Sequence, residues 1–127
     1  MRHCALLVVL TLVLTSSLAF GTPRIVDQAS GPYYDIRSAL AEVSQGDTVR
    51  VMPGTYTGYM NCIITTGGIY PLVLESFGGP DVTIIDCEDS WNGISFTDGE
   101  DTTAVFRGFT VRNALGFSGA GLAITAA

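Results

Sequence analysis

Lysine is absent from this chain of 127 residues, and histidine occurs once, at His3. Six arginines face 12 carboxylates, so the formal net charge is −6. A surface of this charge repels phosphate backbones and anionic lipid headgroups. The composition therefore argues against nucleic acid and against a membrane surface as partners.

The first 21 residues have the pattern of a secretory signal peptide. A basic start, MRHC, precedes the apolar run ALLVVLTLVLTSSLAF, and small residues near Ala19 and Gly21 suit cleavage. A membrane span needs about 18 to 25 apolar residues, and this run is shorter and interrupted by hydroxyl side chains. We expect a secreted or cell-surface product with no membrane insertion after cleavage.

Removal of that segment changes the chemistry that remains. Five arginines then face 12 carboxylates, and 5 − 12 gives a net charge of −7. Because His3 is lost, the mature residues cannot supply a Ser/His/Asp triad, a Cys/His dyad or a histidine-ligated zinc site.

Cysteine is also scarce, and only Cys62 and Cys87 remain after the leader. In an exported protein such a pair suggests a disulfide, which at a spacing of about 25 residues would join neighbouring structural repeats. Two buried thiols are the alternative, because pairing depends on Cα geometry that a sequence does not show.

One amphipathic helix is expected near the start of the mature chain. In YDIRSALAEVSQG the apolar residues recur at helical spacing: Ile36, Ala39, Leu40 and Val43. Asp35 suits the N-cap and Gly46 suits the end, so the predicted helix runs from Asp35 to about Ser44.

The rest of the chain has the pattern of short strands that repeat. TVRVMPG, LVLESFG and NGISFTDG recur about every 22 residues, which aligns Val51 with Leu74 and Leu74 with Phe96. GLAITAA begins a further repeat at Leu122 and Ile124, and a second series, VTIID and FTVRN, aligns Ile84 with Val111. Strands at this spacing predict stacked turns of a solenoid.

A β-sandwich is the alternative to a solenoid. Asn92-Gly93 and Asp98-Gly99 are typical of hairpin turns, which a sandwich needs between its strands. They flank a single short strand, however, and a sandwich offers no reason for the repeat.

The residues GDTVRVMPGTYTG, which follow the helix of YYDIRSALAEVSQ, resemble the opening of right-handed parallel β-helix proteins of the pectin lyase-like superfamily. VTIIDCEDSWNGISF, VFRGFTVRNA and SGAGLAI resemble later turns of that fold. The likeness implies an all-β fold, a right-handed parallel β-helix with an N-terminal amphipathic capping helix. It leaves the activity open, because this superfamily includes lyases, hydrolases, esterases, adhesins and inert surface proteins.

The resemblance also implies a domain organisation. Residues 1–21 are the signal peptide, 22–33 a lead-in, and 34–127 the cap and first turns of the β-helix. The helix is suited to cover the open first edge of the coil, whose backbone groups would otherwise invite pairing. Because Ala127 falls within an expected strand, we expect the β-helix to be truncated there. We also expect a monomer.

Two acidic clusters flank the expected strand at Ile94: Asp86, Glu88 and Asp89 before it, and Asp98, Glu100 and Asp101 after it. Calcium takes six to eight oxygens from such turns, and the resemblance implies that related lyases hold calcium with aspartates. Neither cluster has the spacing of a calcium loop. We expect no metal and no other cofactor, with solvated turns as the main interpretation and calcium as the alternative.

Trp91, the only tryptophan, lies between the two clusters. An indole at such a place stacks on a sugar ring or packs against the side of the coil. Trp91 and the six acids are therefore the candidate ligand-binding residues, and an extracellular polysaccharide or surface glycan is the expected partner.

Catalytic residues stay unknown. The Asn-Thr-Asp, Asp-Asp, His-Gly and Arg-Ile-Lys signatures of polygalacturonases are absent, and Thr57 stands where pectin methylesterases have a glutamate after Gly-x-Tyr. The leading hypothesis is an exported or cell-surface scaffold of the adhesin or carbohydrate-contacting type, without catalytic residues in this segment. The alternative is the N-terminal part of a polysaccharide lyase, glycoside hydrolase or carbohydrate esterase. Outward-facing Arg50 and Glu75 are expected to pair.

Overall fold

The computed structural model describes residues 22–65, 67–68, 71–96, 104–116 and 118–119. The expected signal peptide, the acidic cluster at Asp98, Glu100 and Asp101, and the repeat at Leu122 and Ile124 lie outside these residues. The described residues form short strands, all paired in parallel, and one short helix. The fold is therefore all-β in class and built from parallel sheets.

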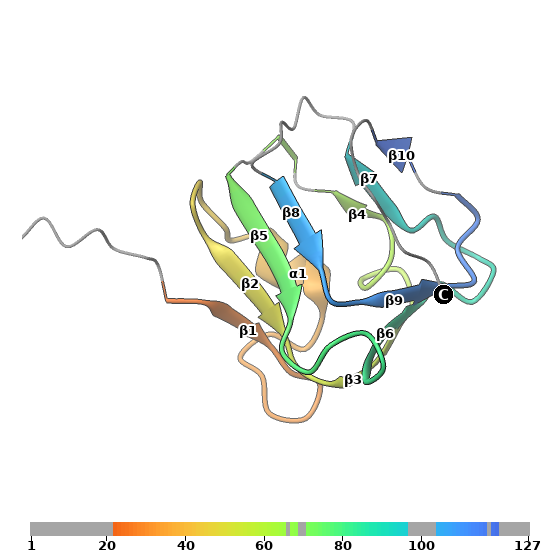
Figure 1. Ribbon diagram of the computed structural model, residues 1–127, viewed down its shortest axis with the longest axis horizontal. Helices are drawn as coiled ribbons and strands as arrows, with labels where there is room; N and C mark the ends of the chain where they lie inside the picture. Colours follow the sequence, from red (N-terminus) through yellow and green to blue (C-terminus); the bar gives the residue numbers. More distant parts are fainter. Residues whose placement is uncertain (1–21, 66, 69–70, 97–103, 117, 120–127) are drawn as a thin grey trace, which may run out of the picture.

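Three parallel sheets make up the structure (Figure 1). The first sheet has the order β1 (Arg24–Val26), β2 (Thr48–Val51), β5 (Leu72–Ser76), β8 (Ala104–Arg107). The second has the order β3 (Gly54–Thr57), β6 (Thr83–Asp86), β9 (Thr110–Arg112), and the third β10 (Ser118–Gly119), β7 (Ile94–Phe96), β4 (Ile64–Thr65). From β2 onward, consecutive strands therefore visit the first, second and third sheets in a fixed rotation.

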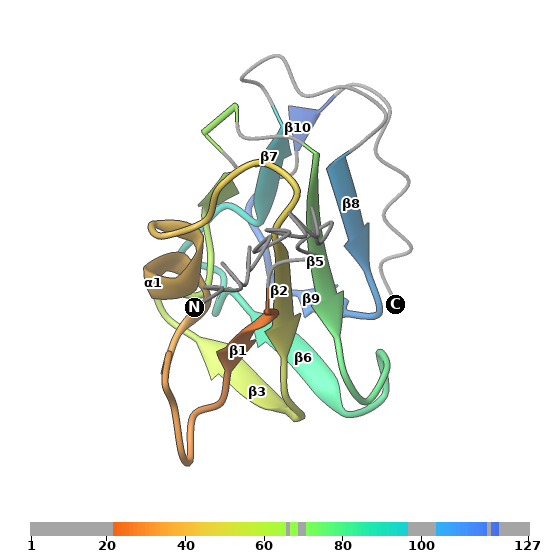
Figure 2. The ribbon, with the colours of Figure 1, turned by 90° about the vertical axis from the view of Figure 1, so that its left-hand side faces the viewer.

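The predicted helix is present but shorter than expected. Helix α1 spans Ile36–Leu40, and the Asp35 side chain accepts a hydrogen bond from the Ser38 N–H, as predicted for the N-cap. The helix ends at Leu40, with Ala41 as its C-cap, rather than near Ser44, because the chain tightens into turns there, with the Glu42 N–H donating to the Ala39 carbonyl. The stripe that was expected to face the core is buried all the same: Ile36, Ala39, Leu40 and Val43. The helix packs against β1 and β2. Figure 2 shows it at the left of the view, near these two strands.

The strand register corrects the predicted alignment of the first series. Val49, not Val51, pairs with Leu74, and Val51 pairs with Ser76. A shift of two residues leaves the same side chains facing inward, so the apolar alternation does not distinguish the two registers. Leu74 pairs on its other side with Phe106 of β8, whereas Phe96 belongs to β7 in the third sheet. The alignment of Leu74 with Phe96 is therefore wrong, because strands of different sheets have similar patterns.

The predicted alignment of the second series, Ile84 with Val111, is wrong by one residue. Ile85 pairs with Val111, and both side chains are buried, while the half-buried Ile84 pairs with Thr110. Adjacent isoleucines fit either phase of the strand alternation, which explains the error. The lead-in contains a strand that the sequence did not indicate, since β1 pairs with β2 from Arg24 to Val26.

The core lies between the sheets and under the helix. Inward-facing residues come from every part of the described chain: Val26, Val49, Val51, Ile64, Leu72, Leu74, Ile85, Ile94 and Val111. Tyr56 is also fully buried, and its hydroxyl donates to the Met52 carbonyl at 2.7 Å. Burial raises the pKa of Tyr56 to about 12, so this tyrosine stays protonated. In the described residues, no helix has the length and apolar character that crossing a bilayer requires.

The outer face of the first sheet carries a row of paired charges. Glu75 on β5 accepts from Arg50 on β2 at 2.9 Å and from Arg107 on β8 at 2.6 Å. The predicted pair of Arg50 and Glu75 is confirmed, and Arg107 extends it. Hydrogen bonds from Arg107 and then Arg50 lower the pKa of Glu75.

Candidate functional site

The turns that lead from the second sheet to the third lie beside one another. They comprise residues 58–63 after β3, 87–93 after β6 and 113–116 after β9, and are here called the aromatic corner. Backbone hydrogen bonds connect successive turns: Ile63 N–H donates to the Asn92 carbonyl at 2.8 Å, and Leu115 N–H to the Trp91 carbonyl at 3.0 Å. Side chains of the three turns therefore share one edge of the molecule.

Two aromatic rings meet at the aromatic corner. Tyr59 and Trp91 contact edge to face, with ring centroids 5.4 Å apart and planes at 67°. Tyr59 is 47% exposed, whereas Trp91 is half-buried and packs against the core. The packing of the indole predicted as one alternative is therefore present, and its contact with the exposed Tyr59 ring places it at the border of the surface.

Arg37 of helix α1 joins the ring pair. Its guanidinium carbon lies 4.3 Å from the centroid of Tyr59, a cation–π contact. Within the described part of the chain, Arg37 makes no ion pair, and its Nη1 is buried without a hydrogen-bond partner. Met60 and Leu115 add exposed apolar surface on the neighbouring positions. The ring pair is therefore a surface feature with apolar neighbours and one cation.

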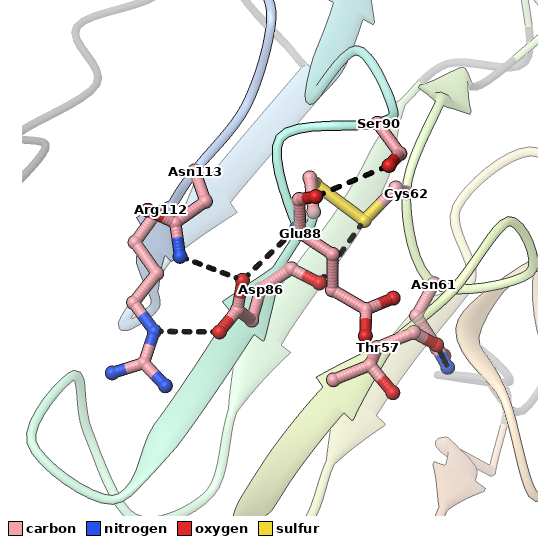
Figure 3. Close-up of a disulfide and its surroundings, with 9 residues drawn as sticks. Thr57, Asn61, Cys62, Asp86, Glu88, Ser90, Arg112 and Asn113 are labelled. Atoms are coloured by element: carbon pink, nitrogen blue, oxygen red, sulfur yellow. Dashed lines mark hydrogen bonds and ion pairs between the residues drawn. A yellow bond between two sulfur atoms is a disulfide. The ribbon is translucent and has the colours of Figure 1, made fainter.

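Asp86 ends β6 and is engaged by its neighbours (Figure 3). Its carboxylate accepts from Asn113 Nδ2 at 2.9 Å, from Arg112 Nε at 2.9 Å and from the Glu88 N–H at 3.0 Å. These contacts lower the pKa of Asp86, with the hydrogen bond from Asn113 as the largest cause. These contacts favour the ionised carboxylate and join β6 to β9 and the turn beyond it.

Glu88 and Asp89 adopt left-handed backbone conformations, with φ of 54° and 55°. Glycine and asparagine favour this region, so two successive acidic residues there are uncommon. The Ser90 hydroxyl donates to the Glu88 carbonyl, and the Asp89 N–H to the Asn113 carbonyl at 2.8 Å. Both acidic side chains are exposed at the surface beside Trp91.

Cys62 and Cys87 form the disulfide that was one of the two predicted alternatives. Their Cα atoms are 5.8 Å apart, and both residues are fully buried. Figure 3 shows the bond next to the turn that carries Glu88 and Ser90. The crosslink joins the first two turns of the aromatic corner.

The predicted site residues are thus only partly brought together. Asp86 ends β6, and Glu88, Asp89 and Trp91 lie in the turn that follows it, whereas the second acidic cluster falls outside the described residues. Among the residues that the structure describes, no group of three or more Asp, Glu, Cys or His side chains could hold a metal ion.

Sequence reasoning missed Tyr59, Arg37 and Asn61. The Asn61 side chain, 6% exposed, accepts from the Ile36 N–H at 3.0 Å and donates to the Thr57 carbonyl at 2.8 Å, so it ties this turn to the helix. The position of Tyr59 three residues before Cys62 was the available signal, since a disulfide would bring that turn beside Trp91.

No protein-family model matches the chain, and neither curated proteins nor solved structures give a match.

Proposed function

We propose that this protein is an exported or cell-surface scaffold of the adhesin or carbohydrate-contacting type, and that the aromatic corner is its contact site. The observation that carries the proposal is the edge-to-face pair of Tyr59 and Trp91 at the surface. Aromatic rings bind the apolar faces of sugars, while exposed acids such as Glu88 and Asp89 accept hydrogen bonds from hydroxyl groups.

We further propose that the three sheets are the faces of a right-handed parallel β-helix of the pectin lyase-like superfamily. Support comes from the fixed rotation of strands among the sheets and from the parallel pairing throughout the described residues. The connection between two parallel strands of the same sheet is right-handed in nearly all proteins. The helix packed on β1 and β2 fits the role of a cap.

Secretion is proposed on two grounds. The leader pattern of residues 1–21 is that of a signal peptide. The disulfide between Cys62 and Cys87 fits an oxidising compartment, since such bonds are rare in reducing ones. The proposed form is a monomer without a cofactor. Calcium binding is the alternative, and a change in polysaccharide binding on addition of calcium or of a chelator would reveal it.

The test is electrophoresis of the oxidised protein through native gels that contain soluble polysaccharides. The gels hold neutral xyloglucan or mixed-linkage β-glucan, or acidic polygalacturonate, and retardation of the band reports binding. Trp91→Ala is expected to reduce the affinity about three- to tenfold. Phe77→Ala is the control, because Phe77 is an aromatic residue, 64% exposed, at a different corner of the molecule.

The outcomes separate the hypotheses. Equal retardation of the wild type, Trp91→Ala and Phe77→Ala, or no retardation in any gel, contradicts the contact site. Appearance of unsaturated ends in the gel polysaccharide would favour a lyase and new reducing ends a hydrolase, while release of the alcohol or acid from an esterified polysaccharide would favour an esterase.

A further inference from the structure

The disulfide and the ring pair connect the same two turns. Cys62 and Tyr59 lie in the turn after β3, and Cys87 and Trp91 lie in the turn after β6. The cysteine Cα atoms are 5.8 Å apart and the ring centroids 5.4 Å apart. The covalent bond therefore sets the separation of the two backbones from which the rings project.

Short hydrogen-bonded turns connect each cysteine to its ring. The N–H groups of Asn61 and Cys62 both donate to the Gly58 carbonyl, at 3.0 and 3.1 Å, which closes a compact loop around Tyr59. The Trp91 N–H donates to the Cys87 carbonyl at 3.2 Å. A displacement of either cysteine would therefore be transmitted to the ring on its turn.

The surroundings make the crosslink a lasting part of the site. Both cysteines are fully buried, whereas Tyr59 is about half exposed. Thiol–disulfide exchange requires a thiolate to reach a sulfur atom, so a folded protein with buried sulfurs exchanges slowly. Two backbone bonds also join the far ends of the turns, from Ile63 to Asn92 and from Ile64 to Gly93. These bonds lie next to Cys62 and Trp91, so the disulfide and the ring contact hold the other ends of the two turns, where Tyr59 and Cys87 lie.

We propose that the Cys62–Cys87 disulfide is a positioning crosslink that holds Tyr59 against Trp91 as one contact site, so that its reduction disables the site. This inference rests on the proposed function for its effect on binding. A dithiol reductant would open the bond by two successive exchange steps. Two electrons pass to the protein disulfide, Cys62 and Cys87 each take a proton and end as thiols, and the dithiol becomes a cyclic disulfide.

Trp91 fluorescence tests the geometry without any ligand, because the chain has no other tryptophan. The oxidised protein is compared with the C62A/C87A variant and with protein reduced by dithiothreitol. In the absence of the crosslink we expect emission at longer wavelength and about twofold stronger quenching by acrylamide, while far-UV circular dichroism shows the strands retained. Unchanged emission and quenching in folded, crosslink-free protein overturns the proposal.

A double-mutant cycle tests the coupling of the crosslink to the ring. Tyr59→Ala is made in the oxidised protein and in C62A/C87A, and retardation by the polysaccharide that binds the wild type is measured. We expect each change alone to weaken binding about three- to tenfold, and the crosslink removal to add almost nothing once Tyr59 is absent. Additive losses, or no loss from C62A/C87A, would overturn the proposal.

Two controls keep the result interpretable. If C62A/C87A unfolds in buffer, the measurements are made in about 1 M sucrose, which favours the compact state. Gly108→Ala, which destabilises a distant corner, is expected to leave Trp91 emission and binding unchanged. If the wild type binds none of the polysaccharides, the proposed function fails, and the fluorescence comparison alone then decides whether the crosslink positions the rings.

Discussion

The two corners that flank the second sheet are built in different ways. The aromatic corner consists of longer turns held by a disulfide, ring contacts and polar side chains. The corner between the first and second sheets, residues 52–53, 77–82 and 108–109, is here called the glycine corner because neighbouring side chains pack closely against two of its glycines (Figure 1). A Cβ at Gly78 would lie 2.6 Å from Val82 Cγ2, and a Cβ at Gly108 would lie 2.5 Å from Ser76 Oγ.

The two corners differ in how far their residues can be substituted. At Gly78 and Gly108 of the glycine corner a single added methyl meets a neighbour, so few residues fit at these two positions. At the aromatic corner non-glycine residues occupy left-handed conformations at Ile63, Glu88, Asp89 and Asn113, and side-chain contacts hold the turns. Surface turns fixed by side chains can vary in residue type without loss of the sheets, which suits a binding site.

The largest effect is expected from loss of the crosslink at the aromatic corner. The disulfide closes a loop of 25 residues, for which the chain-entropy estimate is about 3.5 kcal/mol of unfolding free energy. Urea denaturation of C62A/C87A against the oxidised wild type measures it. A loss below about 1 kcal/mol would mean that this corner depends on its other contacts.

At the glycine corner, Gly108→Ala is expected to cost about 2 to 3 kcal/mol. The φ of +82° costs an alanine about 1 to 2 kcal/mol. The new Cβ also displaces the Ser76 hydroxyl, which donates to the Gly108 carbonyl and accepts from Gly79, a loss of about 1 kcal/mol. Urea denaturation is the measurement.

Gly46→Ala is the matched control for that change. Gly46 has a similar φ of +86°, but no atom lies within 4 Å of the position of its Cβ. It should therefore show the conformational cost alone. Equal losses for the two glycines would contradict tight packing at the glycine corner.

A smaller effect of opposite sign is expected at Thr83, which follows the glycine corner at the start of β6. Its side chain is fully buried, and its hydroxyl has no hydrogen-bond partner in the described structure. Thr83→Val keeps the shape and removes the unsatisfied group, so the unfolding free energy should rise by about 1 kcal/mol. A fall in the thermal midpoint would show that the hydroxyl is satisfied in solution.

The smallest effect is expected from acid. The pKa of Glu75 is lowered from its ordinary 4.5 by Arg107 and Arg50. A lowered folded-state pKa stabilises the protein above the unfolded-state value, and this contribution is lost as the pH falls through the folded-state pKa. Because Arg107 is 65% exposed, the contribution should stay below about 1 kcal/mol.

Urea midpoints measured from about pH 6 to pH 3 check this prediction. Glu75→Gln should reduce the slope below pH 4.5, and Asp86→Asn, at the aromatic corner, should reduce it at lower pH, since the ordinary pKa of Asp86 is 3.8. If neither substitution changes how the urea midpoint depends on pH, other carboxylates cause that dependence.

Several elements were predictable from local pattern. The N-cap at Asp35, the buried stripe from Ile36 to Val43 and the outward pair of Arg50 and Glu75 follow from periodicity and agree with the structure. Register was not predictable to the residue, because a two-residue shift of β2 against β5 keeps the same faces buried, and adjacent Ile84 and Ile85 allow either phase.

The candidate site shows the same limit. The acids and Trp91 stand close together in the sequence, so their turn was predictable, but Tyr59 and Arg37 come from other turns and elements. No local pattern links these residues, since a cross-turn contact depends on which strands are neighbours.

The all-β class, the short helix and the positions of β2, β5, β6, β7 and β9 follow from the sequence alone, because hydrophobic periodicity and turn residues act over a few neighbours. The strand register, the choice of sheet for each strand, and the meeting of Tyr59, Trp91 and Arg37 beside the Cys62–Cys87 bond appear only in the folded structure. These depend on packing between residues more than 20 positions apart in the chain, which the alternation of apolar residues leaves open.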